Sequence, residues 1–274
     1  CWVPPCLLAG GRPRRIVNAP YIMTHLYPFQ GKSYRMRRHP HEAATFGGIA
    51  CRGFAMEKEP VMEAFDLGES PSALIVIDMQ HGFIDAMSSL CIVGAQETVP
   101  ACARVLDTAR GSGVPVIYAL RRYAPDGSDV EAARLEAWLA DRALSDGCDD
   151  PHTCDVPVVM APKEGDRVIF KPRYSAFFGT GLDVLLRRLG VQTVVLIGTT
   201  TPNCVRSSCY DALSLDYNVV VVSDCTSSRT PDVQRANLED MAMAGAQIID
   251  SGRYCGRGLT GLPDHARTAR AFVG

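Results

Sequence analysis

The chain has 274 residues, of which 47% are hydrophobic and 21% charged, with a formal net charge of −2. This composition is typical of a folded globular protein and excludes disorder along the whole length, and the short apolar runs exclude a membrane-spanning helix. Residues 1–56 carry eight basic residues and one acidic residue, so the rest has a net charge of −9, which argues against a nucleic-acid surface on the main part of the chain.

Residues 1–71 show no sustained helical or strand period, because proline and glycine pairs interrupt the segment repeatedly. We expect a basic, mostly irregular N-terminal extension there. The chain begins with Cys1, and the composition changes from basic to acidic at Met56. One hypothesis is that the natural start is Met56 or Met62; a basic targeting arm and an arm that pads the domain are the alternatives.

From residue 72 onward, strand and helix patterns alternate. The expected strands are short apolar runs: Ala73–Ile77, Val114–Ala119, Arg167–Phe170, Thr193–Ile197, Val219–Val222 and Gln247–Ile249. The expected helices have apolar residues three to four apart: Glu97–Arg110, Val130–Leu144, Leu182–Leu189, Asn203–Asp216 and Pro231–Ala244. The pattern predicts an α/β fold over residues 72–250. It would be a doubly wound, Rossmann-like sandwich with a six-stranded, mainly parallel sheet and helices on both faces, followed by a loose tail at residues 251–274.

The chain contains eleven cysteines, an odd number, and no recognisable secretory segment. We therefore expect reduced thiols and a cytoplasmic protein. No CxxC pair is present, and the nearest approach to a metal-ligand pattern is Cys148, His152 and Cys154. Neither a dinucleotide-binding GxGxxG motif nor a Walker-type motif occurs. We expect no metal and no organic cofactor.

Three ionisable residues are predicted at the carboxyl ends of strands, where open parallel sheets bind ligands. Asp78 follows the first strand, Lys171 follows the third, and Cys204 lies in the turn after the fourth. With Thr201 as N-cap and Pro202 at the first helical position, Cys204 falls at the third helical position, N3. The helix dipole favours a thiolate there, so we expect the pKa of the Cys204 thiol to be lowered. Taken singly, each residue has an ordinary structural role. Together they supply a nucleophile, a base and a cation.

The motifs IDMQ followed by F, then K-x-R-x-S-A-F, then G-x-x-T-x-x-C-V occur in this order. They resemble those of the isochorismatase-like cysteine hydrolases, which include nicotinamidases, isochorismatases, and N-carbamoylsarcosine, ureidoacrylate and biuret amidohydrolases. The resemblance implies that Asp78, Lys171 and Cys204 form a catalytic triad and that the Thr199–Thr200 peptide bond is cis. It also implies an oxyanion hole made by the backbone N–H groups of Thr200 and Cys204, a small-molecule substrate, and a homo-oligomer, either a dimer or a tetramer.

The chemistry implied by this resemblance is hydrolysis of a C–N bond in a small amide or ureido compound. Asp78 would accept the thiol proton of Cys204, the thiolate would attack the carbonyl, and water would later cleave the thioester. Two alternatives remain open. One is an isochorismatase-type hydrolysis of a vinyl ether in the same pocket, and the other is a non-catalytic binding module with the same fold.

The residues after the second strand bear on the substrate. Metal-dependent nicotinamidases of the superfamily place an Asp-x-His pair there, whereas this sequence has Leu120–Tyr123, so a metal-bound nicotinamidase is disfavoured. Arg121 and Arg122 suit a substrate carboxylate or ureido oxygen, and we expect at least one of them to be a solvated loop charge instead. Arg206 is expected to face either the pocket or a neighbouring subunit. Further candidates for the pocket lining are Gln80, Phe83, Tyr174 and Phe177.

Overall fold

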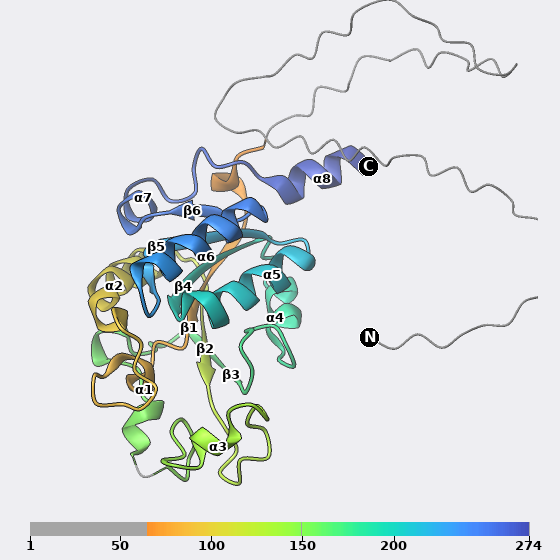
Figure 1. Cartoon of the computed structure of the whole chain (residues 1–274). Coiled ribbons are helices and arrows are strands. Elements are labelled where there is room, and N and C mark those ends of the chain that lie inside the picture. The colour runs from red at the N-terminus through yellow and green to blue at the C-terminus, as the bar shows by residue number, and fades with distance from the viewer. Residues whose placement is uncertain (1–64, 149, 274) are drawn as a thin grey trace, which may run out of the picture. The chain divides into compact units, whose positions relative to one another are not determined.

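The computed structural model describes residues 65–148 and 150–273. Of the extension predicted for residues 1–71, residues 1–64 therefore lie outside the described part of the chain. Six strands form one sheet in the order β3-β2-β1-β4-β5-β6 (Figure 1). They are β1 Ser72–Ile77, β2 Val116–Arg121, β3 Arg167–Lys171, β4 Thr193–Thr199, β5 Asn218–Ser227 and β6 Gln247–Ile249. All strand pairs are parallel, which confirms the predicted doubly wound α/β fold.

Helices cover both faces of the sheet because its central strands are buried on both sides. In β1, Leu74 and Val76 join one hydrophobic core with Leu106, while Ile75 and Ile77 join a second core on the opposite face. Helices α2 and α7 contribute to the first core, and α4, α5 and α6 contribute to the second. The helices are α1 His81–Ile84, α2 Ala95–Gly111, α3 Leu135–Trp138, α4 Leu182–Arg188, α5 Arg206–Ser214, α6 Pro231–Met243, α7 Ser251–Arg257 and α8 His265–Val273.

The strand order reverses at β1, which pairs with β2 on one side and with β4 on the other. An open parallel sheet offers a ligand-binding crevice beyond the carboxyl ends of the strands at such a point. Asp78 follows β1, Arg121 ends β2, Lys171 ends β3, and a helical turn at Thr201–Val205 follows β4. The topology therefore gathers these four parts of the chain at one edge of the sheet.

The carboxyl ends of β1 and β4 approach each other closely at Gly198. Its φ is +122°, and a Cβ placed on it would lie 2.0 Å from the carbonyl oxygen of Ile77. Glycine has no Cβ and populates positive φ readily, so it is the residue that this approach requires. The contact holds the segment after β4 against the end of β1.

The connection between β2 and β3 differs from the prediction. Of the helix expected at Val130–Leu144, only α3 is helical. The chain bends back on itself, with positive φ at Arg142 and Leu144, and its apolar side chains converge on a small third core. The regular apolar spacing therefore reflects a folded-back loop rather than one helix face. The residues of this core are Phe83, Tyr123, Val130, Trp138 and Leu144.

Residues 251–273 form α7 and α8 rather than the loose tail expected from the sequence. The segment before α8 is fixed by a hydrogen bond of 2.8 Å from the side-chain amide of Asn218 to the carboxylate of Asp264. The N–H of Leu67, whose side chain is buried in the first core, donates to the carbonyl of Leu262 at 2.8 Å. Both helices are short, and this explains why the apolar period did not reveal them.

Within the described part of the chain, no helix combines the length and the apolar character needed to cross a membrane. The eight cysteines in this part are all free thiols.

Candidate active site

A buried ion pair joins the ends of β1 and β3. The Lys171 ammonium lies 2.7 Å from Oδ2 of Asp78, and both side chains are fully buried. The ammonium also donates to the carbonyl of Arg173 at 3.2 Å. Among the described residues, Oδ1 of Asp78 has no hydrogen-bond partner. Burying charged groups costs free energy. The presence of a buried ion pair with an unpaired carboxylate oxygen is therefore better explained by a chemical role of these residues than by a contribution to the stability of the fold.

The segment that carries Cys204 is anchored to β5. The peptide bond between Thr199 and Thr200 is cis. The hydroxyls of Thr200 and Thr201 both donate to the carbonyl of Ser227, at 3.1 and 2.9 Å. Thr200 is the N-cap of the turn, rather than the expected Thr201, because the turn is wound as a π-helix before α5 begins. Cys204 therefore occupies the fourth helical position and not the third.

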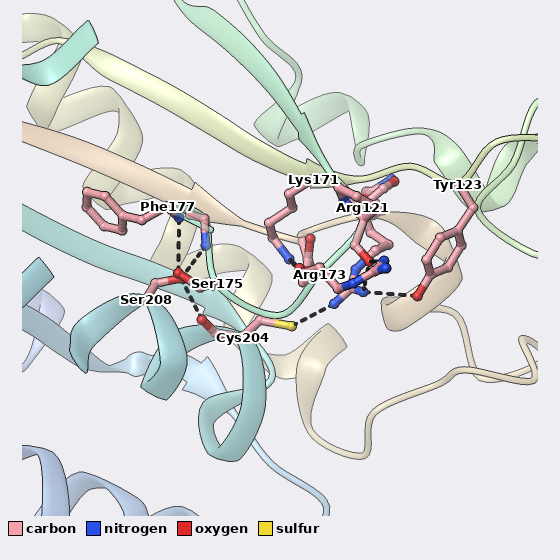
Figure 2. A network of polar contacts seen from close by, with 12 residues as sticks. Arg121, Tyr123, Lys171, Arg173, Ser175, Phe177, Cys204 and Ser208 are labelled. Atoms are coloured by element: carbon pink, nitrogen blue, oxygen red, sulfur yellow. Dashed lines mark hydrogen bonds and ion pairs between the residues drawn. The ribbon is translucent and has the colours of Figure 1, made fainter. Parts of the chain in front are cut away.

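Cys204 is buried at the second hydrophobic core, and its thiol faces charged side chains. Figure 2 shows its sulfur directed at the guanidinium of Arg121, with Nη2 3.4 Å away, and the ammonium of Lys171 beside it. Burial raises the pKa of the Cys204 thiol; the charges of Lys171 and Arg121 lower it, and the charge of Asp78 raises it further. The lowered pKa expected from the helix terminus is therefore wrong, because desolvation dominates. This direction favours the protonated thiol over the thiolate.

Arg121 is held rigidly by partners on its other nitrogen. Nη1 donates to the carboxylate of Glu131 at 2.6 Å, to the hydroxyl of Tyr123 at 2.9 Å and to the carbonyl of Pro172 at 3.2 Å. Burial opposes ionisation of Glu131, but the charge of Arg121 and the hydrogen bonds that the carboxylate accepts together outweigh it and keep the pKa of this carboxyl below its usual range. Nη2 is thereby left to face Cys204.

Arg121→Gln is expected to move the pH profile of Cys204 alkylation by iodoacetamide to higher pH. The Arg121 guanidinium lowers the pKa of the Cys204 thiol, whereas burial raises it. Removing the guanidinium should therefore raise the pKa of the thiol. Alkylation rates measured across pH, with the modified peptide identified by mass spectrometry, would give the midpoint. Arg122→Gln is the matched control, because Arg122 is partly exposed and pairs with Asp146. Equal midpoints in the two variants would contradict the assigned contact.

Three of the predicted pocket residues have structural roles instead. The amide nitrogen of Gln80 donates to the carbonyls of Arg121 and Cys154, each at 3.0 Å, and its oxygen accepts from the Arg121 N–H at 2.7 Å. Gln80 therefore positions the end of β2. Phe83 belongs to the third core, and Phe177 belongs to the second.

Tyr174 lies at the edge of the site, whereas two of the predicted arginines lie away from it. The Tyr174 ring is 36% exposed, and its centroid is 5.4 Å from the guanidinium carbon of Arg121. Arg122 stacks on Phe170 at 5.2 Å in addition to pairing with Asp146. Arg206 contacts α6 instead of a pocket, since it donates to Asn237 at 3.1 Å and lies 2.5 Å from Asp240.

Glu131 and Tyr123 are partners of Arg121 that were not predicted from the sequence. Tyr123 follows Arg121 by two residues, which is a usable signal because alternate residues of an extended segment face the same side. Glu131 gave no such signal, because it lies in the loop that was assigned to a helix.

The residues at the carboxyl end of β2 do not fit the Asp-x-His metal pair of nicotinamidases. The position is occupied by Arg121, Arg122 and Tyr123, and the buried guanidinium of Arg121 would repel a cation beside Cys204.

Comparison with known proteins places this geometry in context. The isochorismatase domain matches residues 72–253. A protein of Arabidopsis thaliana described as a probable inactive nicotinamidase is 37% identical over 179 residues, which cover 64% of this chain and 90% of that protein. Ureidoacrylate amidohydrolase RutB of Agrobacterium fabrum is 31% identical over 212 residues, which cover 71% and 92%. A crystal structure of an isochorismatase family protein from Desulfovibrio vulgaris has a TM-score of 0.62 and 38% identity, covering 67% and 96%.

Proposed function

This chain belongs to the isochorismatase family, and from that premise we propose that it is a cysteine-dependent amidohydrolase that cleaves a C–N bond in a small amide or ureido compound. The observation that carries the proposal is the meeting of Asp78, Lys171 and Cys204 at one edge of the sheet, where the three side chains are buried and one carboxylate oxygen of Asp78 has no partner among the described residues. Amidohydrolase activity is also the activity named for RutB.

In the proposed reaction, Asp78 removes the proton from the Cys204 thiol as sulfur attacks the substrate carbonyl. The charges of Lys171 and Arg121 stabilise the thiolate as it forms. We assign the stabilisation of the oxyanion to the backbone N–H groups of Thr200 and Cys204. Donors of this kind typically contribute about 3 kcal/mol each to the stabilisation of the transition state. Asp78 then protonates the departing nitrogen, the C–N bond breaks, and water hydrolyses the thioester to a carboxylate or carbamate.

The substrate class follows from the guanidinium beside the sulfur. Nη2 of Arg121 donates to nothing but the sulfur among the described residues, so it has hydrogen-bonding capacity toward an oxygen next to the scissile carbonyl. A ureido oxygen or a short carboxylate suits this charge. Tyr174, stacked on the same guanidinium and partly exposed, would cover the outer side of the substrate.

The test is ammonia release from a panel of ureido acids, N-carbamoyl amino acids, short amides and nicotinamide, with a vinyl ether as the alternative substrate. We expect turnover of a ureido or amide compound, and we expect Asp78→Asn to lower kcat by about 100-fold or more, because the base is lost. Asp232→Asn, an exposed acid on α6, is the matched control and should retain full activity.

Two outcomes would count against the proposal. A folded chain that turns over no member of the panel would favour a binding module, a possibility raised by the relative described as probably inactive. Full activity of Asp78→Asn would remove Asp78 from the role of base.

A further inference from the structure

Two short helical segments bring three metal-ligating side chains together beside the active-site strands. His81 is the first residue of α1 and Asp85 is its C-cap, whereas His152 lies in the 3₁₀ turn Pro151–Cys154. One ligand atom from each residue can be chosen so that all three lie within 4.8 Å of one another. Nδ1 of His81 is 3.0 Å from the Asp85 carboxylate, and Nε2 of His152 is 3.8 Å from it.

A backbone hydrogen bond, a side-chain cap and ring stacking hold this cluster in place. The N–H of His81 donates to the carbonyl of Asp155 at 2.8 Å, which joins α1 to the 3₁₀ turn. The turn is capped by Asp150, whose carboxylate accepts from the N–H of His152 at 3.1 Å. The two imidazole rings are stacked, with their centroids 3.8 Å apart. The ligand atoms are therefore close to one another before any ion binds.

A fourth residue supplies an independent sign of a metal site. The carboxylate of Asp155 lies 3.5 Å from Nδ1 of His152, on the opposite ring nitrogen from Asp85. Histidines that bind metals usually direct their second ring nitrogen at a carboxylate, which fixes the tautomer and the ring orientation. This arrangement leaves Nε2 of His152 as the ligand atom and points it toward Asp85 and His81.

We propose that His81, Asp85 and His152 bind a divalent transition-metal ion, with Zn²⁺ as the best fit, and that Asp155 orients His152. Two imidazoles and one carboxylate form a common zinc ligand set, which leaves a fourth position for water. Mg²⁺ and Ca²⁺ prefer sets made only of oxygen. The side chain of His152 is 55% exposed, so the ion can enter from solvent. This set differs from the group of Cys148, His152 and Cys154 considered from the sequence.

The site would support the active site without taking part in the reaction. Gln80, which precedes α1, donates both to the carbonyl of Arg121 and to that of Cys154 at the end of the 3₁₀ turn. A metal that ties α1 to this turn would stiffen the two segments that hold Gln80, and through it the end of β2.

The test is Zn²⁺ binding to the metal-stripped full chain, measured by isothermal titration calorimetry and chelator competition. Residues 1–64 contain three more histidines, so the readout is the difference in equivalents bound between variants. We expect His81→Ala and His152→Ala each to lose one equivalent together with the rise in thermal midpoint that Zn²⁺ gives. Asp155→Asn should weaken this equivalent by about 10- to 100-fold, the range seen when such orienting partners are removed.

His265→Ala is the matched control, since this histidine lies at the start of α8, and it should keep the full stoichiometry. Circular dichroism would establish that each variant is folded. The proposal is overturned if His152→Ala binds as many equivalents as the wild type. It is equally overturned if Cys154→Ser loses the equivalent while His81→Ala retains it, because a cysteine-based site would then be responsible.

Discussion

Cys204→Ala is expected to lower the hydrolysis rate by at least about 10⁴-fold while leaving the fold intact, which is the scale seen when the nucleophile of a covalent hydrolase is removed. The thiol is buried among Asp78, Lys171 and Arg121, and none of these residues supplies another nucleophile to the same position. Ammonia release measured under saturating substrate, with circular dichroism as the check on folding, would give the ratio of rates.

Cys209→Ala is the matched control for this variant. Cys209 lies in α5, five residues beyond Cys204, and both belong to the second core, but burial alone raises the pKa of Cys209 to about 12, whereas charged groups act on Cys204. Its removal deletes one buried sulfur without touching the charged groups around Cys204, so activity should remain near that of the wild type. Substantial ammonia release by Cys204→Ala, or a comparable loss in Cys209→Ala, would rule out a covalent role for Cys204.

Gly198→Ala is expected to destabilise the protein by about 4 kcal/mol or more, or to prevent folding. The added methyl group would lie 2.0 Å from the carbonyl oxygen of Ile77, and both partners are backbone in the centre of the sheet, so neither can move aside. The positive φ of +122° adds to the cost for any residue with a Cβ. The measurement is the free energy of unfolding from denaturant titration, or the soluble yield where the variant does not accumulate.

Gly256→Ala provides the contrast within the same protein. Gly256 lies in α7, and a Cβ on it would meet no atom within 4 Å. Alanine is favoured over glycine in a helix by up to about 1 kcal/mol, so this variant should be as stable as the wild type or slightly more stable. If Gly198→Ala were as well tolerated as Gly256→Ala, the close approach of β4 to β1 would be contradicted.

Most of the sheet could be predicted from the sequence because its strands leave an unambiguous pattern. Runs such as Ala73–Ile77 and Val219–Val222 are apolar without interruption, which is expected of strands buried on both faces. The loop between β2 and β3 could not be predicted in this way. Its apolar residues have helical spacing, but they pack into a third core that only the folded loop creates.

The candidate triad was predictable because three motifs fall at strand ends, and parallel topology brings strand ends together. The state of Cys204 was not, since it depends on how completely the folded protein excludes water from the sulfur, which local sequence does not encode. The candidate metal site could not be predicted for a similar reason: His81 and His152 are 71 residues apart, and only their packed helical turns bring them together. The homo-oligomer, the cytoplasmic location and the domain boundaries stay predictions.

The ion pair between Asp78 and Lys171 connects β1 with β3, although β2 lies between these two strands. β3 is the outermost strand on its side, and its Val168 and Phe170 are 42% and 54% exposed. Strands of this kind open in local fluctuations well before a domain unfolds as a whole. Each opening of β3 would separate the ammonium from the carboxylate, so this ion pair depends on the pairing of a peripheral strand as well as on the interior of the sheet.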